Sequence, residues 1–162
     1  MPIQPSASDI IVSNICDINP SDDDLMCLVN ILSLLAPVDI DRADISRVRA
    51  HINALAVESH VPPVNKKYIL VALHRGQIVG TGSLLVEQKI IHGMGKTAHL
   101  EDLVVSKSYQ GTGVAGILIK SLKQLAHQHQ CYKVILNASD SLRIFYIKHG
   151  FVLNSNGMRC SL

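Results

Sequence analysis

The chain has 162 residues, of which 48% are hydrophobic and 17% charged, with a formal net charge of +2. A chain of this length buries a substantial core, so we expect one domain over residues 1–162. The small net charge does not favour a nucleic-acid surface, and no apolar stretch approaches the ~20 residues that span a bilayer. The start "MPIQPSASD" lacks signal-peptide features, so we expect a cytoplasmic protein with no nucleic-acid or membrane partner.

Four cysteines are scattered along the chain, with no CxxC pair and no Cys/His cluster at zinc spacing. This distribution favours reduced thiols in an intracellular protein over disulfides, and it predicts no metal site. The four positions are Cys16, Cys27, Cys131 and Cys160.

The first third of the chain predicts one strand and two helices. Residues 9–15, "DIIVSNI", predict the strand. Ser21 and the three aspartates after it predict a helix cap with acids at the positive end of the helix dipole. Apolar residues at helical spacing follow, and Pro37 closes this helix. A second helix is expected over about 41–59, followed by a loop at 60–67, "HVPPVNKK", because neighbouring prolines stop helices.

The middle of the chain predicts an antiparallel sheet. Residues 68–73 and 78–91 form a predicted hairpin whose turn is carried by Gly76. A further turn at 92–97, "HGMGKT", leads into a strand at 98–105, "AHLEDLVV".

The last third alternates between helix and strand. We expect helices over about 112–129 and 141–148, with strands at 133–136 and from 151 to about 158. This alternation, added to the hairpin, predicts an α/β fold on a mixed sheet.

The segment "YQGTGVAGIL" joins the 98–105 strand to the helix that follows. Gly111 and Gly113 lie where the unpaired amides and the dipole of a helix N-terminus favour an anion such as a phosphate. A tight strand-to-helix turn without a ligand is the alternative interpretation. The loop lacks the Lys-Ser or Lys-Thr of a Walker A site and the downstream acid of a Rossmann unit.

The sequence "QGTGVA" at 110–115 matches the Q/R-x-x-G-x-G/A signature of the GNAT N-acetyltransferases. Together with "VEQKIIHGMGKTAHLEDLVV", "CYKVIL" and "FYIKHGF", it resembles the glucosamine 6-phosphate N-acetyltransferase family of that superfamily over residues 79–151. The first 60 residues match only in their order of elements. The resemblance implies a GNAT fold, with a mixed, mostly antiparallel central sheet flanked by helices and a splayed strand pair that holds acetyl-CoA.

The resemblance also implies which residues hold the cofactor. The loop amides grip the pyrophosphate of acetyl-CoA, and the backbone of the 98–105 strand pairs with the pantetheine arm as an added strand would. The expected acetyl-CoA contacts are Leu103, Val104, Val105, Gln110, Gly111, Thr112, Gly113, Val114, Ala115, Gly116 and Tyr146.

Glu101 and Asp102 are the candidate general bases, because acyl transfer to an amine requires the neutral amine and a carboxylate can accept its proton. Neighbouring residues of a strand face opposite ways, so we expect one acid on each face. An ordinary buried strand that starts with two acids is the alternative. Tyr146, the tyrosine that the resemblance assigns, is the candidate acid for the departing thiolate, or else a packing tyrosine. The amide of Leu103 is the candidate donor to the carbonyl oxygen.

The resemblance further implies a site for the sugar phosphate. Lys89, His92, Tyr132 and Lys133 match positions that bind it in the family, some of them across a dimer interface. Lys89 alone is also compatible with a solvated lysine at a strand end. Because Tyr132 and Lys133 are expected on the far side of the 112–129 helix from Lys89, we expect a homodimer with shared active sites.

Several positions depart from the family pattern. Where relatives have an aspartate beside the amine, this chain has Ser139 followed by Asp140, and Leu142 replaces an asparagine ahead of the Phe-Tyr pair. Of the basic C-terminal segment only Arg159 remains. We include Ser139, Asp140 and Arg159 with Glu101 and Asp102 in the expected substrate contacts.

The sequence therefore predicts acetyl transfer from acetyl-CoA to glucosamine 6-phosphate, toward UDP-N-acetylglucosamine. Two alternatives stay open: a GNAT enzyme for another small amine or a protein amino group, and an acyl-CoA-binding module without catalysis.

Overall fold

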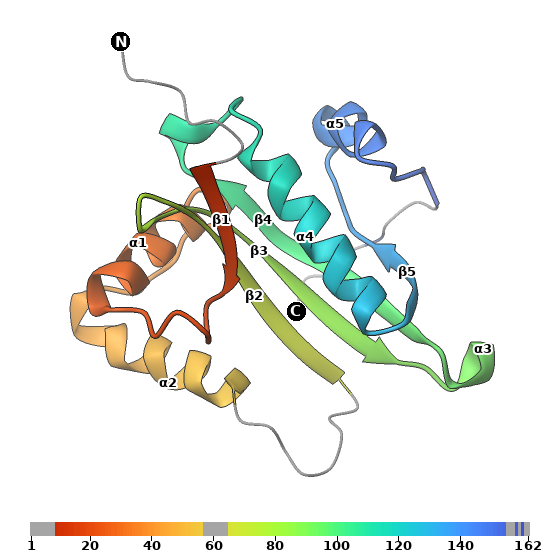
Figure 1. Cartoon of the computed structure of the whole chain (residues 1–162), viewed down its shortest axis with the longest axis horizontal. Helices are drawn as coiled ribbons and strands as arrows, with labels where there is room; N and C mark the ends of the chain where they lie inside the picture. The colour runs from red at the N-terminus through yellow and green to blue at the C-terminus, as the bar shows by residue number, and fades with distance from the viewer. Residues whose placement is uncertain (1–8, 57–64, 155–157, 159, 161–162) are drawn as a thin grey trace.

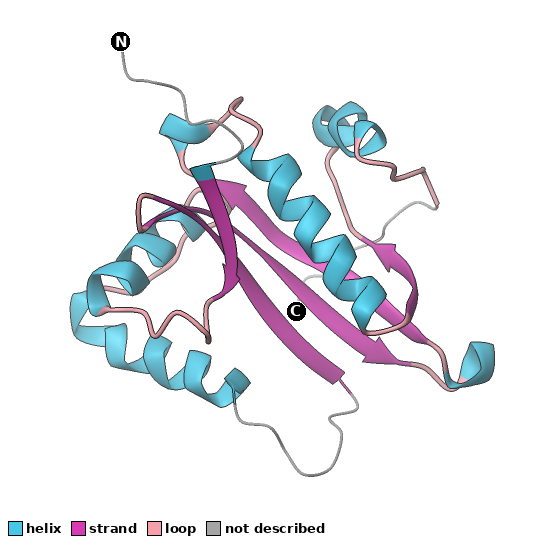
Figure 2. Ribbon diagram, in the orientation of Figure 1, coloured by secondary structure: helices cyan, strands magenta, loops and turns pink. Residues whose placement is uncertain are grey.

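The computed structural model describes residues 9–56, 65–154, 158 and 160. Its strands form one five-stranded sheet in the order β1-β2-β3-β4-β5, antiparallel except for the parallel pair β4–β5 (Figures 1 and 2). The strands are β1 Ile10–Asn14, β2 Asn65–His74, β3 Gln77–Gln88, β4 Lys96–Val105 and β5 Cys131–Ile135. The predicted α/β mixed sheet is thereby confirmed.

Helices cover both faces of this sheet. The α-helices are α1 Asp22–Leu32, α2 Ile45–Ala56, α3 Ile91–Met94, α4 Val114–Gln128 and α5 Arg143–Lys148, and the 3₁₀ helices are η2 Arg42–Asp44, η3 Lys107–Tyr109 and η4 Asp140–Leu142. The apolar stripe of α4 packs on Leu70 and Ala72 of β2, while α1 and α2 pack on Val71 between them. Since neighbouring side chains of a strand face opposite ways, α4 lies on one face and α1 with α2 on the other.

Helix α4 lies close to the sheet because β3 carries glycines beneath it. A Cβ at Gly82 would stand 2.9 Å from Cδ1 of Leu122, and one at Gly80 would stand 3.2 Å from the carbonyl oxygen of Val104. Any larger side chain at these positions would push α4 away from β3.

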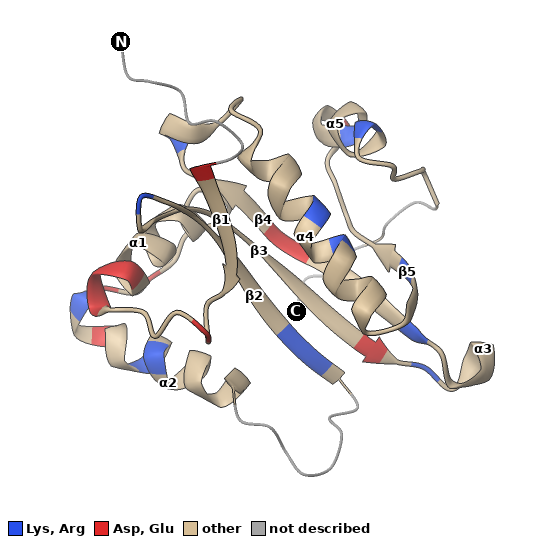
Figure 3. Cartoon of the chain, viewed as in Figure 1, with Lys and Arg blue, Asp and Glu red and all other residues tan. Residues whose placement is uncertain are grey.

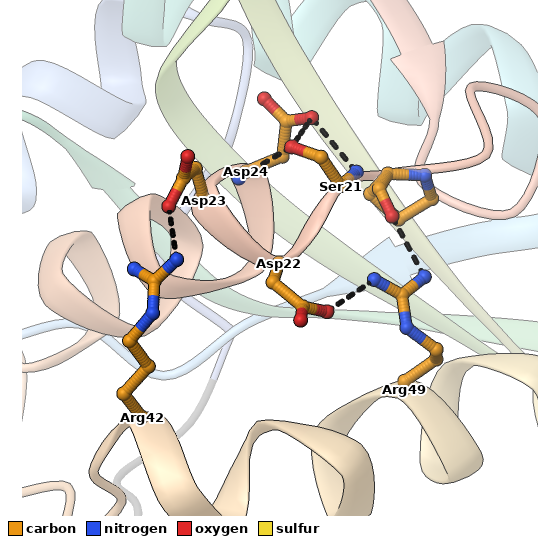
Figure 4. Close-up of polar contacts among 7 residues, drawn as sticks. Ser21, Asp22, Asp23, Asp24, Arg42 and Arg49 are labelled. Carbon is orange, nitrogen blue, oxygen red and sulfur yellow. Dashed lines mark hydrogen bonds and ion pairs between the residues drawn. The ribbon is translucent and has the colours of Figure 1, made fainter.

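The start of α1 is capped as its sequence predicts. Ser21 is the N-cap, and its side chain and that of Asp24 form a reciprocal capping box. Arg42 of η2 contacts Asp23 at 2.8 Å, and Arg49 of α2 contacts Asp22 at 2.6 Å (Figure 4). Figure 3 shows this acidic turn of α1 beside basic positions of the η2–α2 segment, so the pairs fix α2 against α1.

Several predicted boundaries are wrong. The expected loop at 60–67 ends earlier, because residues 65–67 already pair with β3. The second helix starts where it was expected, at about 41, but its first turn is the 3₁₀ helix η2, where the Asp41 side chain accepts from the amides of Ala43 and Asp44. The expected turn at 92–97 contains α3, and His92 and Gly93 within it have positive φ.

The strand expected from 151 to 158 is absent in the part of it that the structure describes. Residues 151–154 have no secondary structure, and residues 155–157 lie outside the described residues. Val152 is 84% exposed and Leu153 68% exposed. The alternation of helices and strands along the chain predicted a strand here, but no described neighbour supplies the ladder that a strand needs.

Candidate functional site

The glycine loop stands at the N-terminus of α4 as the sequence predicts. Gly111 has φ +77° and Gly113, the N-cap residue, has φ +91°, so both use backbone conformations that side chains disfavour. A Cβ at either position would meet no atom within 4 Å, which leaves this side of the loop open. The first hydrogen bond of the helix runs from the amide of Ile117 to the carbonyl of Gly113 at 3.2 Å.

The amides of Val114, Ala115 and Gly116 precede that bond and have no acceptor inside the helix. Their position at the positive end of a 15-residue helix suits an anion. The lack of a side chain at Gly116 also has a structural reason, since a Cβ there would stand 2.8 Å from Cε1 of His149. Gly116 therefore allows the end of α5 to approach α4.

The polar side chains of the loop brace its backbone. Nε2 of Gln110 donates to the carbonyl of Val105 at 3.3 Å, and Oγ1 of Thr112 donates to the carbonyl of Tyr109 at 2.6 Å. These bonds engage both side chains inside the protein. Gln110 and Thr112 therefore favour anion binding mainly by stabilising the backbone conformation of the loop.

Strands β4 and β5 diverge beside this loop. Their parallel pairing ends at His99 and Ile135, whereas β4 continues to Val105. The side chains of Val104 and Val105 are buried on the two opposite faces of the sheet, and Leu103 packs on the α4 side. The edge of β4 from residue 100 to 105 has no partner strand on the β5 side within the described residues, so its backbone is open to an extended ligand.

A β-bulge separates Glu101 from Leu103. Thr81 pairs with Val104 and Ser83 with Glu101, so Gly82 alone stands opposite Asp102 and Leu103. Asp102 has φ +54°, a left-handed conformation that aspartate tolerates better than most residues.

The bulge overturns the expected arrangement of the two acids. Glu101 shares the face of its partner Ser83, and Asp102 lines a cavity on that same face. Both acids are exposed, so neither is buried on the α4 side. The prediction of one acid on each face is wrong because it assumed an uninterrupted strand.

Asp102 closes one side of a cavity of about 410 Å³ between the sheet and helices α1 and α2. Nζ of Lys67 lies 3.5 Å from Oδ2 of Asp102, and both residues line the cavity. Lys67 was not predicted as a site residue, because it is on the part of β2 that was predicted to be loop. The wall is completed by Leu28, Val29, Leu32, Val38, Ile40, Asp44, Arg47, Val48, His51, Ile52, Ile69, Thr81 and Ser83.

Tyr146 is half-buried on α5. Its ring packs edge-to-face against Phe145 and Phe151, at centroid distances of 5.1 and 5.8 Å. Burial raises the pKa of its phenol above the usual 10.0, and no described residue hydrogen-bonds to the hydroxyl. The group therefore keeps its proton at neutral pH and has that proton available to a ligand.

His92, Tyr132 and Lys133 gather at the start of β5. The His92 and Tyr132 rings are 4.7 Å apart, and Nζ of Lys133 lies 5.5 Å from the centre of the Tyr132 ring. Gly95 accommodates Tyr132, because a Cβ there would lie 3.1 Å from Cδ1 of the ring. The amide of Lys89 donates to the carbonyl of Gly95 at 2.9 Å, so Lys89 belongs to the same end of the sheet.

The ammonium of Lys89 contacts Oε1 of Glu87 at 2.6 Å, and Oε2 of Glu87 lies 2.9 Å from Nε2 of His99. Hydrogen bonds from Lys89 and then from His99 lower the pKa of the Glu87 carboxyl. Glu87 and His99 were not singled out from the sequence, because their pairing depends on the register of β3 with β4.

This arrangement removes the original reason for expecting a dimer. Tyr132 and Lys133 do not lie on the far side of α4 from Lys89, since β5 pairs with β4 and Lys133 stands opposite Thr97. The cation group is instead separated from the acids along β4. Glu101 is four residues along β4 from Thr97, which corresponds to roughly 14 Å.

Two of the three remaining predicted substrate contacts, Ser139 and Asp140, are on the segment between β5 and α5. Oγ of Ser139 lies 2.8 Å from Oγ of Ser141, and Asp140 forms an ion pair with Arg143. Ser139 and Asp140 are exposed. Arg159 lies outside the described residues.

A metal centre and a membrane span each require a recognisable set of residues. In the ranges 9–56 and 65–154, with residues 158 and 160, no group of three His, Cys, Asp or Glu residues is arranged to hold a metal ion. None of the helices in these ranges has the length and apolar character needed to cross a membrane.

Comparison with known proteins agrees with the open β4 edge and the glycine loop. Residues 40–159 match the acetyltransferase (GNAT) domain. The chain belongs to the GNAT acetyltransferase family. Members of this family use acetyl-CoA as the acetyl donor, which fits an extended ligand on β4 with an anion at the start of α4.

Individual relatives and one solved structure show which members of the family the chain is similar to. Glucosamine 6-phosphate N-acetyltransferase of Candida albicans is 36% identical over 113 residues, covering 70% of this chain and 71% of the relative. The enzyme of that name from Trypanosoma brucei brucei is 40% identical over 87 residues, covering 54% and 59%. A crystal structure of a Trypanosoma brucei acetyltransferase superposes with a TM-score of 0.74 at 28% identity, covering 95% of this chain and 100% of that one. The predicted GNAT fold is confirmed.

Proposed function

We propose that this chain transfers the acetyl group of acetyl-CoA to the amine of D-glucosamine 6-phosphate, forming N-acetyl-D-glucosamine 6-phosphate and CoA, as a step toward UDP-N-acetylglucosamine. The observation that carries acetyl transfer is the unpaired edge of β4, which leads directly into the left-handed glycine loop. The choice of sugar follows the names of the relatives.

In this proposal the donor lies along β4 and the start of α4. The amides of Val114, Ala115 and Gly116 bind the pyrophosphate, and the backbone of Leu103 and Val105 pairs with the pantetheine arm. The Leu103 amide donates to the thioester carbonyl, where it stabilises the oxyanion that develops during attack.

The reaction is a direct attack in a ternary complex. Glu101 or Asp102, directly or through a water, takes a proton from the ammonium of the sugar, and the neutral nitrogen attacks the thioester carbon. The carbon–nitrogen bond forms, the carbon–sulfur bond breaks, and Tyr146 donates its phenolic proton to the leaving thiolate. The nitrogen loses its second proton on becoming an amide, and that proton returns to the Tyr146 phenolate. The Tyr146 phenol is protonated at neutral pH, since burial raises its pKa above 10.0, and its hydroxyl has no hydrogen-bond partner among the described residues.

The sugar phosphate is assigned to the cations at the β3–β4 and β5 ends: Lys89, His92 and Lys133, with Tyr132. Ser139 and Asp140 are proposed to orient the amine, and Arg159 to reach the phosphate. The roughly 14 Å between this group and the acids along β4 favours a homodimer in which one chain's cations serve its partner's acids. We also place the enzyme in the cytoplasm, where acetyl-CoA and sugar phosphates are available.

One observation favours a different acceptor. The cavity beside Asp102 is lined mainly by aliphatic side chains of α1, α2 and β2. An amine with an apolar body would fill this space better than a sugar phosphate would. The second candidate is therefore a GNAT reaction on such an amine, with the same donor site and the same acid and base.

The test is thiol release from acetyl-CoA with a panel of amines: glucosamine 6-phosphate, glucosamine, a lysine peptide and an aliphatic amine. We expect glucosamine 6-phosphate to have the highest kcat/KM, and Tyr146→Phe to suppress its turnover, which separates enzymatic transfer from background hydrolysis. Faster transfer to the aliphatic amine would favour the second candidate. Binding of acetyl-CoA without transfer to any amine would favour a non-catalytic module.

A further inference from the structure

A hydrogen bond links the β2–β3 turn to the residue from which the glycine loop departs. Nδ1 of His74 lies 2.8 Å from the hydroxyl oxygen of Tyr109, which is 35 residues away in sequence. The two rings also meet edge-on, with centroids 5.5 Å apart. Both side chains are partly buried, so the bond is shielded from competition with water.

The His74 end of this bond is fixed by the sheet. His74 is the last residue of β2 and pairs with Gln77 of β3 on one side and Ile10 of β1 on the other. The turn between β2 and β3 consists of Arg75 and Gly76, whose φ values of +50° and +79° are characteristic of a tight type I′ hairpin. His74 therefore presents its ring from a rigid position.

The Tyr109 end controls the loop. Tyr109 is the last residue of η3, and its carbonyl accepts from both the amide and the hydroxyl of Thr112, at 3.3 and 2.6 Å. The conformations of Gly111 and Gly113 are otherwise restrained little, because glycine has more accessible backbone states than any other residue. Fixing the Tyr109 hydroxyl restricts where the loop begins.

We propose that His74 is a positioning residue for the acetyl-CoA loop. It holds Tyr109, and through the Tyr109 carbonyl it holds Thr112, so that the amides at the start of α4 are arranged before the donor arrives. Such preorganisation favours binding because less conformational freedom is lost on association. The inference rests on the proposed function in one respect, namely that the loop binds the pyrophosphate of acetyl-CoA.

The experiment compares His74→Leu, which removes the ring nitrogen of the bond, with His74→Asn, which keeps a polar atom near the place of Nδ1. Tyr109→Phe removes only the hydroxyl and leaves the ring on the core. His129→Leu is the matched control, since His129 is also a partly buried histidine beside a tyrosine, Tyr68, but at the other end of α4, roughly 22 Å away. Acetyl-CoA affinity is measured by calorimetry, kcat and KM by thiol release, and loop mobility by hydrogen exchange of residues 109–116 without ligand.

We expect His74→Leu and Tyr109→Phe each to weaken acetyl-CoA binding about three- to tenfold, the range that one hydrogen bond supplies. The KM for acetyl-CoA should rise with kcat nearly unchanged, His74→Asn should restore most of the affinity, and His129→Leu should bind normally. The double variant His74→Leu/Tyr109→Phe should be no weaker than either single variant, because both remove the same bond.

Wild-type affinity and unchanged loop exchange in Tyr109→Phe would overturn the inference, and so would effects that add in the double variant. Because Tyr109→Phe keeps the ring, this test holds even if His74→Leu fails to fold. If the wild-type protein bound no acetyl-CoA at all, the proposed function would fail. Hydrogen exchange of the free protein would then still decide whether His74 orders the loop.

Discussion

In Tyr146, the ring makes the packing contacts and the hydroxyl is the group proposed to act in catalysis. Its ring contacts Phe145 and Phe151, while no described residue bonds to its hydroxyl. Tyr146→Phe should therefore leave the thermal midpoint and acetyl-CoA affinity nearly unchanged. Turnover should fall about a hundredfold or more, because the lost interaction forms only as charge develops on sulfur. Single-turnover kinetics beside calorimetry measure both, and a fall below about threefold would make Tyr146 a packing residue.

The raised pKa of Tyr146 also predicts a pH dependence. Burial favours the neutral phenol, so Tyr146 stays protonated as pH rises through 10.0. The fall in activity that its deprotonation causes should therefore appear only above that pH. Glu101→Gln, in contrast, should be partly rescued as pH rises, since more of the amine is then already neutral. The measurement is kcat/KM against pH for both variants. If Tyr146→Phe were rescued in the same way as Glu101→Gln, the division between acid and base would be wrong.

Single residues also mark where sequence reasoning succeeds and where it fails. The positive φ of Gly111 and Gly113 was foreseeable, because glycine at a strand-to-helix junction has a local meaning. The bulge at Asp102 was not foreseeable, since it depends on which residue of β3 faces it. The same holds for Lys67, whose contact with Asp102 joins residues far apart in the chain.

Among the elements, α4 and β3 are packed closely at Gly82. A Cβ at Gly82 would already be 2.9 Å from Leu122 and 3.2 Å from Leu103. Gly82→Val should therefore destabilise the fold by about 1–3 kcal/mol through overpacking. Leu122→Ala alone should also destabilise, but the double variant should lose less than the sum of the two single losses, because the smaller side chain leaves room for the valine methyl groups. Urea unfolding of both single variants and the double variant tests this, and strictly additive losses would contradict it.

Element prediction was most successful where the signals were local. The capping box of Ser21 and Asp24 set the start of α1, and the glycine loop set the start of α4. It failed for 151–154, where a strand was expected from the alternation of helices and strands but has no described strand to pair with. Strand formation depends on a neighbouring strand, and the local sequence does not determine which segment supplies it.

For the whole molecule, the separation of the cations from the acids is the main consequence of the fold. The antiparallel β3–β4 pair and the parallel β5 bring Lys89, His92, Tyr132 and Lys133 to one end of β4, while Glu101 and Asp102 stand at the bulge. A group of exposed apolar side chains also follows β5 in the chain: Leu142, Ile144, Ile147, Val152 and Leu153. Both features fit association of two chains, because exposed apolar side chains in such number often mark an interface.

The proposed homodimer predicts that two inactive variants restore each other. One parent carries Glu101→Gln with Asp102→Asn, and the other carries Lys89→Ala with Lys133→Ala. If each site joins one chain's acids to its partner's cations, a mixed dimer has one site with every substitution and one intact site. Random exchange of subunits makes about half of the dimers mixed, so about one quarter of wild-type activity should return.

Light scattering of the wild-type protein should give twice the 17.7 kDa chain mass, and activity should rise as the two parents exchange subunits. A parent mixed with itself is the control, and it should stay inactive. No recovery in a mixture shown by mass to contain mixed dimers would mean that each site is built within one chain. A fully active monomer would remove the dimer altogether, and the long reach from the cations to the acids would then have to be bridged within one chain.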